Sequence, residues 1–248
     1  MPTPLVIGVI PARYASTRFP GKPLAMIAGR PMIQWVYEQS SKAKSLGRVL
    51  VATDDDRIAA AVQAFGGTAV LTSPRHACGT DRLAEVAAAF PDVDLVVNIQ
   101  GDEPLIAPDA IDLAVRSLQE HPEAAIGTLV AAASRDDMAN PNVVKVVLDS
   151  TGRALYFSRS PIPYQRSPDG GAPNWKHIGL YAYRREFLIR FSKSPSTPLE
   201  QTESLEQLRA LEMGERIICV ESPYDSISVD SIEDIVKVES ALGIRPAA

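Results

Sequence analysis

The sequence predicts an α/β fold with a mostly parallel sheet, and three observations support this. Short apolar stretches alternate with longer stretches in which apolar residues recur at helical spacing. The short stretches are almost continuously apolar, which is typical of parallel strands covered by helices on both faces. Polar residues, proline and glycine follow several of them. Because open α/β sheets bind ligands beyond the carboxyl ends of their strands, we expect a site in these loops.

The alternation is clearest in the first half of the chain. We predict strands over residues 5–10, 49–53, 69–71, 95–99 and 126–130. The first of these is expected to stop at Pro11, because proline has no backbone N–H. We predict helices over residues 32–44, 57–65, 82–90 and 108–120. Gly66 and Gly67 are suitable helix stops, and Thr80 or Asp81 is a candidate cap for the helix at 82–90.

The pattern changes from about residue 140. Strand-like stretches at 143–148, 154–157 and 180–183 follow one another without long helices. The segment 161–175 is rich in proline and glycine and is predicted to be irregular. Two more helices are predicted, over 203–213 and 232–242. We therefore expect a single domain over residues 1–248, with a smaller antiparallel lobe at about 140–185.

Composition narrows the class of protein. With 46% hydrophobic and 22% charged residues the chain resembles an ordinary globular protein, and its net charge of −5 argues against non-specific nucleic-acid binding. Two cysteines give no disulfide framework, and three scattered histidines give no zinc spacing. Since we find neither a leader-like start nor a long apolar run, we expect a reduced, soluble, cytoplasmic protein without a membrane partner.

A cationic loop follows the first predicted strand. Residues 10–24, IPARYASTRFPGKPL, contain Arg13, Arg18 and Lys22, and the first acidic residue of the chain is Glu38. Guanidinium and ammonium groups pair with phosphate oxygens, so the loop suits a triphosphate. A merely solvated basic surface is the alternative that charge alone leaves open. The chain has neither GxxxxGK[ST] nor GxGxxG, which argues against P-loop NTPases and dinucleotide dehydrogenases.

A second chemical centre follows the strand predicted at 95–99. Asp102 lies in the sequence QGDEPLI, directly after this strand. A carboxylate that faces phosphates needs a cation between them, and Mg²⁺ is commonly held by one or two carboxylates plus phosphate oxygens. Asp230, just before the last predicted helix, is available as a second carboxylate. For Asp102 taken alone, an acid that caps a turn is the alternative interpretation.

Taken together, these segments resemble a known family. The cationic loop is similar to the opening signature of sugar nucleotidylyltransferases, and its form resembles the 3-deoxy-manno-octulosonate (Kdo) cytidylyltransferase family. Later segments agree with that family in order: VATDDDRI at 51–58, SPRHACGTDRLAEV at 73–86, NIQGDEPLI at 98–106, NPNVVKVV at 140–147, ALYFSRSPIPY at 154–164, KHIGLYAYRREFL at 176–188 and ESLEQLRALEMG at 203–214. The resemblance covers nearly the whole chain.

The resemblance implies a fold, a reaction and partners. The expected fold is the three-layer, Rossmann-like fold of nucleotide-diphospho-sugar transferases. The expected reaction transfers CMP from CTP to Kdo, with Mg²⁺ as cofactor, and gives CMP-Kdo and pyrophosphate for lipopolysaccharide synthesis. The anomeric hydroxyl of Kdo would attack the α-phosphorus in line; no GxSxG nucleophile elbow suggests a covalent intermediate. The resemblance also implies a homodimer, with the lobe at about 140–185 helping to bind the sugar.

The resemblance further assigns residues to roles. Those expected to contact the nucleotide are Ala12, Arg13, Ser16, Arg18, Lys22, Thr53, Asp54, Ser73, Arg82 and Gln100. Those expected to contact the sugar are Gln100, Arg159, His177, Tyr181, Glu203, Glu206 and Gln207. Catalysis is assigned to Arg13, Lys22, Asp102 and Asp230, and the two aspartates are expected to hold the metal.

Spacing supports some of these assignments and leaves alternatives for others. His177 and Tyr181 would share a face of a strand, and Glu203 and Gln207 a face of a helix. A lone histidine on an apolar strand is otherwise a structural hydrogen-bonding group. Arg82 could instead pair with Glu85, three residues later on a helix.

One departure from the family pattern keeps the acceptor open. The family most often has GVDTPEDL around its last aspartate, whereas this chain has ISVDSIEDI. This form also resembles a branch that uses 8-amino-Kdo. The remaining alternatives are another acidic sugar as acceptor, a metal-dependent glycosyltransferase, and a nucleotide-binding module without catalysis.

Overall fold

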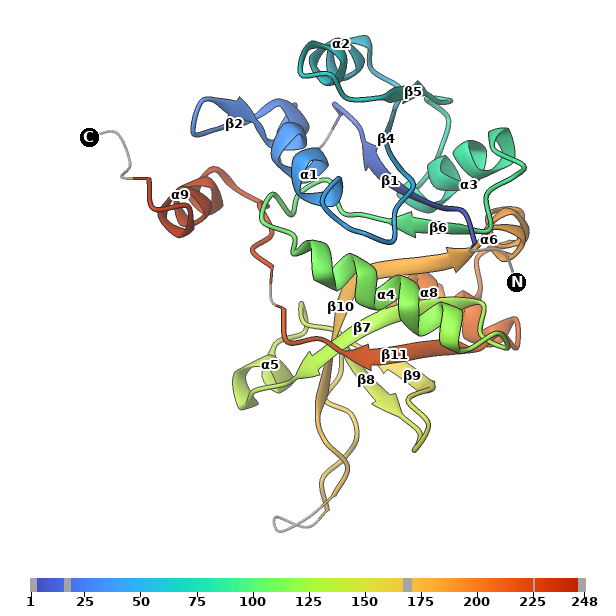
Figure 1. Ribbon diagram of the computed structural model, residues 1–248. Helices are drawn as coiled ribbons and strands as arrows, with labels where there is room; N and C mark the ends of the chain where they lie inside the picture. Colours follow the sequence, from blue (N-terminus) through green and yellow to red (C-terminus); the bar gives the residue numbers. More distant parts are fainter. Residues whose placement is uncertain (1–3, 16–18, 167–170, 225, 245–248) are drawn as a thin grey trace. The chain divides into compact units, whose positions relative to one another are not determined.

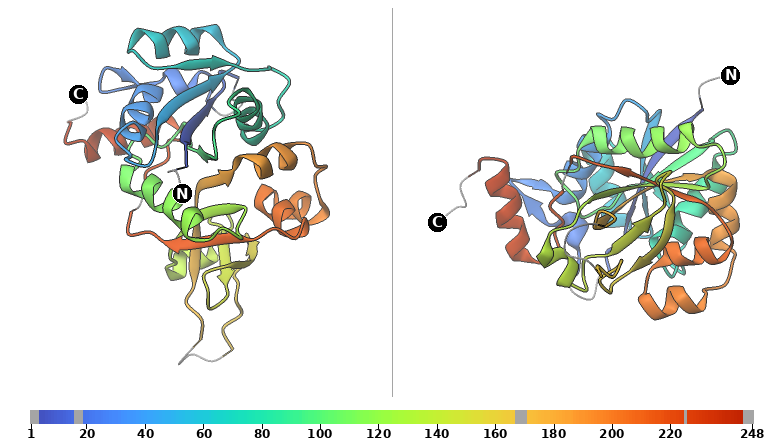
Figure 2. Two further views of the ribbon diagram at one scale, coloured as in Figure 1. Left: turned by 45° about the vertical axis from the view of Figure 1, so that its right-hand side comes forward. Right: turned by 90° about the horizontal axis from the view of Figure 1, so that it is seen from below.

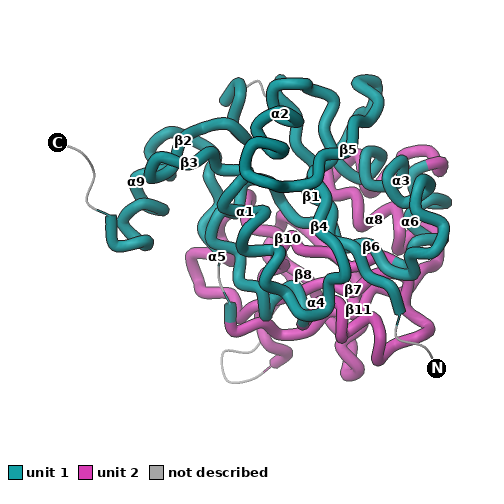
Figure 3. The backbone as a smooth tube through the Cα atoms, turned by 45° about the horizontal axis from the view of Figure 1, so that its top comes forward, with its two compact units in different colours: residues 1–112, 184–192, 224–248 teal, residues 113–183, 193–223 magenta. Residues whose placement is uncertain are grey.

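The computed structural model describes residues 4–15, 19–166, 171–224 and 226–244. The chain forms two compact units (Figure 3). The first comprises residues 1–112, 184–192 and 224–248, and the second comprises residues 113–183 and 193–223. The chain therefore leaves the first unit and returns to it twice. Residues 140–183 of the expected smaller lobe belong to the second unit.

The first unit contains a parallel sheet in the order β6-β1-β4-β5 (Figure 1). Its strands are β1 (Val6–Ala12), β4 (Arg48–Thr53), β5 (Ala69–Leu71) and β6 (Leu95–Asn98). The predicted parallel α/β class is thus confirmed. However, β1 does not stop before Pro11: the pairing with β4 continues through Pro11 and Ala12. Proline lacks a donor but keeps its carbonyl acceptor, so a strand can continue through it near its end.

Helices cover this sheet and connect its strands. They are η1 (Lys22–Leu24), α1 (Met32–Ser40), α2 (Asp56–Ala64), α3 (Gly79–Ala89), α6 (Arg185–Ser192) and α9 (Ile232–Ala241), with a small hairpin of β2 (Met26–Ile27) and β3 (Arg30–Pro31). The predicted end of the first helix at residue 44 was wrong, because α1 ends at Ser40. The predicted cap of α3 was also wrong: Cys78, in an extended conformation, precedes the helix. The sequence interpretation missed α6.

The second unit is built around β7 (Ile126–Ala132). This strand pairs antiparallel with β10 (Trp175–Arg184) and parallel with β11 (Ile217–Glu221). The antiparallel pair β8 (Lys145–Leu148) and β9 (Ala154–Ser158) is joined to β10 through β8 (Figure 2). A short helix, α5 (Arg135–Ala139), follows β7, and α4 (Pro108–Glu120) crosses from the first unit into the second. β10 begins five residues before the predicted start at Leu180, and β11 was not predicted.

The helix predicted over residues 203–213 is in fact two helices. α7 (Pro198–Glu203) ends at Ser204, whose φ of 53° is left-handed, and α8 (Glu206–Glu212) follows. A left-handed residue ends an α-helix, so the break is local. Glu203 and Gln207 therefore do not share a helix face. Within the described ranges, no helix combines the length and the apolar character needed to cross a membrane.

A small hydrophobic cluster fixes the last segment of the chain within the first unit. Val229 and Val238, both without solvent exposure, pack with Ile27 and Met32. Ile227, Ile235 and Leu242 lie against the same cluster. Since Val229 directly precedes Asp230, this packing determines where the Asp230 backbone lies.

Candidate active site

Lys22, Asp102 and Asp230, which are far apart in sequence, come together in the first unit. The Lys22 Nζ lies 2.7 Å from Asp102 Oδ2 and 3.3 Å from Asp230 Oδ1. It also donates a hydrogen bond of 2.8 Å to the Val229 carbonyl. Three oxygens thus surround one ammonium group. The structure brings together the lysine and the two carboxylates that the sequence singled out.

Close backbone approach builds this cluster. Lys22 begins η1 directly after Gly21, whose φ of 71° is left-handed and suits glycine. Asp102 follows Gly101, where a Cβ atom would lie only 3.0 Å from the Pro11 carbonyl. A larger residue would crowd this carbonyl, so glycine allows the segment after β6 to approach β1 this closely. The Val229 N–H donates to the Asp102 carbonyl at 2.9 Å, which ties the last segment to the end of β6.

Asp230 and Asp234, four residues apart, have different roles. Asp234 forms a capping box with Ser231 at the start of α9 and also accepts from the Asp230 N–H at 3.0 Å. Its hydrogen bond with Lys237 and those with backbone N–H groups hold the pKa of Asp234 well below its usual range. The Asp230 carboxylate takes no part in the cap and instead contacts Lys22. Helix capping therefore explains the second aspartate of ISVDSIEDI but not the first.

The arrangement of the two carboxylates fits a divalent cation. Asp102 and Asp230 converge on a single positive charge, which here is the Lys22 ammonium. Among the residues that the structure describes, no group of three or more His, Cys, Asp or Glu side chains could hold a metal ion. A metal held by these two carboxylates would therefore need further ligands from substrate or water, as Mg²⁺ commonly has.

A cavity of about 260 Å³ opens at the end of β1. Its lining comes from the end of β1 and from the start of α3 with the preceding loop: Pro11, Ala12, Arg13, His76, Ala77, Cys78, Gly79 and Arg82. Three of the predicted nucleotide contacts, Ala12, Arg13 and Arg82, are among these residues. The small side chains leave room for a flat ring near the backbone.

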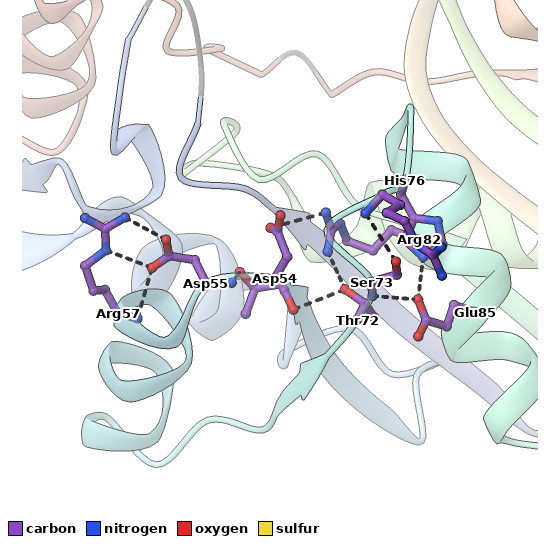
Figure 4. A network of polar contacts seen from close by, with 10 residues as sticks. Asp54, Asp55, Arg57, Thr72, Ser73, His76, Arg82 and Glu85 are labelled. Atoms are coloured by element: carbon purple, nitrogen blue, oxygen red, sulfur yellow. Dashed lines mark hydrogen bonds and ion pairs between the residues drawn. The ribbon is translucent and has the colours of Figure 1, made fainter.

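A polar network lies beside this cavity (Figure 4). Arg82 is buried, contacts the Thr72 hydroxyl, and has its Nη2 3.2 Å from Asp54 Oδ1. The alternative pairing of Arg82 with Glu85 is not what the structure shows. Glu85 instead accepts a hydrogen bond of 2.9 Å from the Ser73 N–H and contacts His76. These two interactions, with that from Ser73 the larger, lower the pKa of Glu85.

The other predicted nucleotide contacts differ in their surroundings. Thr53 is fully buried, and its carbonyl accepts from the Thr72 N–H at 2.9 Å, so it joins β4 to the segment after β5. The Ser73 hydroxyl accepts from the Arg75 N–H at 3.2 Å. Gln100 is half-buried and follows β6. Ser16 and Arg18 lie outside the described residues. The role of each in nucleotide binding stays a prediction.

His177 and Tyr181 contact one another in the second unit. The pairing of β10 with β7 shifts register between Ile178 and Tyr181, so simple strand alternation does not relate them, yet the two ring centroids are 5.2 Å apart. The His177 Nε2 lies 2.9 Å from the Thr128 hydroxyl, which also has two carbonyl acceptors, those of Leu180 at 2.8 Å and Ile178 at 3.2 Å. Because a carbonyl can only accept, we assign the hydroxyl hydrogen to these carbonyls and the shared hydrogen to His177 Nε2, which makes Nδ1 the acceptor of the neutral ring.

Burial controls the charge of both side chains. It lowers the pKa of His177 to about 3 and raises that of Tyr181. The imidazole is consequently neutral near pH 7. A neutral histidine can bind a sugar hydroxyl but cannot contribute a positive charge toward the sugar carboxylate.

Arg159 and Glu203, both predicted to contact the sugar, bind one another. The Glu203 carboxylate accepts from the Ser158 hydroxyl and from the Arg159 N–H, the latter at 2.9 Å. The Arg159 guanidinium donates to the Glu203 carbonyl at 2.8 Å and to the Pro141 carbonyl at 3.1 Å. These contacts join the end of β9 to the end of α7. Glu206 and Gln207 begin α8, and the Gln207 side chain is buried.

The sequence interpretation missed Lys145. This side chain has no solvent exposure, and its Nζ donates to the carbonyls of Asn140 (3.0 Å), Val143 (2.6 Å) and Arg159. Burial, followed by the nearby Arg159 charge, lowers its pKa. The signal in the sequence was a lysine within the apolar stretch VVKVV. A buried cation with three carbonyl acceptors holds the loop before β8 against the end of β9.

A parallel α/β sheet with two carboxylates and a cation near its strand ends suits an enzyme that binds a metal-bound phosphate substrate. The family model for cytidylyltransferases matches residues 7–217. With the relatives described next, this shows that the chain belongs to the 3-deoxy-manno-octulosonate cytidylyltransferase family. The resemblance inferred from its motifs is confirmed.

Individual relatives cover almost the whole chain. The 3-deoxy-manno-octulosonate cytidylyltransferase of Geobacter sulfurreducens is 52% identical over 244 residues, which cover 94% of this chain and 97% of that protein. The protein of the same name from Myxococcus xanthus is 52% identical over 239 residues, covering 96% and 97%.

Solved structures agree with these relatives. A CMP:2-keto-3-deoxy-manno-octonic acid synthetase complexed with CTP is 44% identical, with a TM-score of 0.92, and the match covers 96% of this chain and 98% of that one. A cytidylyltransferase from Leptospira borgpetersenii, 17% identical with a TM-score of 0.66 and coverage of 97% and 87%, shares the fold.

Proposed function

We propose that this protein transfers CMP from CTP to Kdo and releases pyrophosphate. The observation that carries the proposal is the convergence of Asp102, Asp230 and Lys22 at the end of the parallel sheet. Two carboxylates that face one cation suit Mg²⁺ held together with the oxygens of a triphosphate. The acceptor follows from relatives that are 52% identical and are named for Kdo.

The charges of the first unit suggest how the reaction is catalysed. Arg13 and Lys22 would pair with oxygens of the triphosphate and offset the negative charge that develops during in-line attack. Lys22 would exchange its carboxylate contacts for phosphate oxygens, and we assign it to the transferred phosphoryl group. Asp102 and Asp230 would hold Mg²⁺. When bound, this ion supplies positive charge that lowers the pKa of a coordinated sugar hydroxyl.

The residues of the second unit would bind the acceptor. His177, neutral and fixed by Thr128 through Nε2, would accept a hydrogen bond from a sugar hydroxyl at Nδ1. Tyr181, next to it, would supply a further polar group. Gln207 and Glu206 are also assigned to the sugar. Arg159 and Glu203 already bind one another, so they would contact the sugar only through donors and acceptors that this pairing does not use.

The cellular setting is proposed from the family resemblance. The chain would act as a cytoplasmic homodimer and supply CMP-Kdo for lipopolysaccharide synthesis. Sedimentation of the purified protein at several concentrations tests the dimer, because a monomer at all concentrations contradicts it.

The experiment that tests the function is pyrophosphate release from CTP and Mg²⁺ with different acceptors. The acceptors are Kdo, 8-amino-Kdo, N-acetylneuraminate and none. Release that requires Kdo is the expected result. Preference for 8-amino-Kdo would instead assign the altered segment ISVDSIEDI to a changed acceptor site. Tight CTP binding without release for any sugar would contradict catalysis and leave a nucleotide-binding module.

A further inference from the structure

We propose that Arg57 is a positioning residue for the nucleotide site and that it acts through the ring of Tyr14. This inference rests on the proposed function, since it concerns the two cations assigned to the triphosphate. Arg57 lies in the first turn of α2, shortly after β4, and has no assigned role in binding CTP. Its geometry is unusual for a surface arginine.

The Arg57 guanidinium stacks on an aromatic ring. Its central carbon lies 3.3 Å from the centroid of the Tyr14 ring, although 59% of the Arg57 side chain remains exposed. Arginine binds the face of aromatic rings through its planar, delocalised charge. The contact is therefore a close stack and not a chance approach of a solvated side chain.

Asp55 holds the guanidinium in this orientation. Arg57 donates from Nε to Asp55 Oδ1 at 3.0 Å and from Nη2 to Asp55 Oδ2 at 2.7 Å (Figure 4). Asp55 also caps α2 by accepting from the Arg57 N–H at 3.0 Å. The carboxylate is thus fixed by the helix and binds the edge of the guanidinium, which leaves its face to Tyr14. These hydrogen bonds lower the pKa of Asp55, so the pair stays charged near neutral pH.

Tyr14 and Gly21 contact one another within the cationic loop, and we call this pair the neck of the loop. The Tyr14 carbonyl accepts from the Gly21 N–H at 2.9 Å. The Tyr14 ring is also close to Gly21, since a Cβ atom built there would be 3.1 Å from the ring. Residues 14 and 21 are therefore joined through both backbone and side chain. The ring of Tyr14 contacts Gly21 and is covered by Arg57.

The neck places the two cations assigned to the triphosphate. Arg13 directly precedes Tyr14, and Lys22 directly follows Gly21. Both cations are therefore next to the contact between Tyr14 and Gly21. Arg57 and Asp55 connect this contact to the end of β4. Without the stack, Arg13 and Lys22 would sample more orientations, and CTP would have to restrict them on binding. Arg57 would thus influence affinity without touching the substrate.

Arg48 offers a matched control. It lies at the start of β4, whereas Arg57 follows the end of this strand. Arg48 is exposed, and its guanidinium carbon lies 5.7 Å from the centroid of the Phe90 ring. Arg48→Ala thus also removes an exposed arginine from an aromatic ring, at the end of β4 remote from residues 54–57. An effect that is general to such contacts would appear in both variants.

The experiment measures CTP affinity by calorimetry with Mg²⁺ and without acceptor, together with KM values and melting temperatures. Arg57→Ala should weaken CTP binding about fivefold, the factor that corresponds to an exposed cation–π contact of about 1 kcal/mol. KM for the acceptor should stay unchanged in Arg57→Ala, and both KM and CTP affinity should stay unchanged in Arg48→Ala. The melting temperature should fall by at most about 4 °C in either variant. Arg57→Lys, which keeps the charge but not the planar fork, should restore little of the affinity.

A double-mutant cycle tests the route through Tyr14. Tyr14→Leu should weaken CTP binding, and Arg57→Ala should add no further loss in that background. Unchanged CTP affinity in Arg57→Ala, a full additional loss in the Tyr14→Leu background, or equal effects in Arg48→Ala would overturn the proposal. Because binding is measured without acceptor, an error in the proposed sugar would not alter these results.

Discussion

The two units hold their charged residues in different ways. In the first, Lys22 contacts the carboxylates of Asp102 and Asp230 as well as one carbonyl, that of Val229, and the three side chains remain 17%, 29% and 53% exposed. In the second, Lys145 is fully buried and donates to backbone carbonyls, and Arg159 and Glu203 also use backbone groups. A side chain held mainly by partly exposed side chains can change partners when a substrate arrives. One held by the backbone leaves buried groups without partners if it moves, which is costly.

This difference affects how family motifs are interpreted. The motifs NPNVVKVV, ALYFSRSPIPY and ESLEQLRALEMG point to the second unit as strongly as the cationic loop points to the first. In the second unit, however, several of the matched residues form contacts that join β8, β9 and α7. A motif therefore identifies residues that matter without showing whether they bind substrate or support the residues that do.

The largest expected effect comes from the exposed cluster. Asp102→Asn should lower turnover at least about 100-fold, as for the removal of other key electrostatic groups, because one of the two carboxylates on the cation is lost. Lys22→Ala should have an effect of the same order. Steady-state pyrophosphate release measures both. Asp94→Asn is a control, since Asp94 lies at the opposite end of β6 and accepts from the Leu5 N–H. Near-normal turnover in folded Asp102→Asn would contradict the metal assignment.

A smaller effect, on stability and not on chemistry, is expected from the buried cation of the second unit. Lys145→Met fills similar space but leaves three carbonyl groups without their donor. We expect the free energy of unfolding to fall by about 2 kcal/mol, measured by denaturant titration. Turnover of the folded fraction should fall far less than in Asp102→Asn. A stable variant with strongly reduced turnover would show that Lys145 acts on the substrate and would break the comparison.

The smallest effect concerns pH. The pKa of His177 is about 3 in the folded chain, below its ordinary value near 6.5, so the unfolded chain binds the proton more readily between these values. Stability should therefore rise with pH in this window and fall as the pH decreases. The loss attributable to His177 is about 1.4 kcal/mol between pH 7.5 and 5.5. Denaturant titrations of the wild type and His177→Gln at both pH values measure it as a difference. An equal pH dependence in both would refute the burial argument.

Local patterns were enough to predict the class of fold. β5 and α4 have the predicted bounds, and β4 and β6 differ from them by one residue. Features that depend on tertiary contacts were missed. Ser204 adopts a left-handed conformation, which the sequence did not indicate because the residue is not glycine. The sequence of α6, REFLIRFS, is too short for a clear helical periodicity.

The candidate site shows the same limit. The side chains of Lys22, Asp102 and Asp230 do lie together, and each residue was recognisable from its place near a strand or helix end, while their roles in the reaction stay predictions. The Val229 carbonyl, the Thr72 hydroxyl and the contacts of Glu85 with Ser73 and His76 were not predicted. These groups act through contacts between segments that are distant in sequence, and a carbonyl carries no signal in the side-chain pattern. The partners of a site residue therefore require the structure.

The first unit is discontinuous, and this affects the order in which its site forms during synthesis. Asp102 emerges from the ribosome before the second unit, whereas Asp230 and the hydrophobic segment that carries it emerge after that unit. A nascent chain that stops short of residue 229 has Lys22 and Asp102 but lacks the second carboxylate. The pair of aspartates is consequently assembled only after the second unit has been translated. With the proposed roles of both aspartates, cytidylyl transfer would begin only in a chain that already contains the residues assigned to the acceptor.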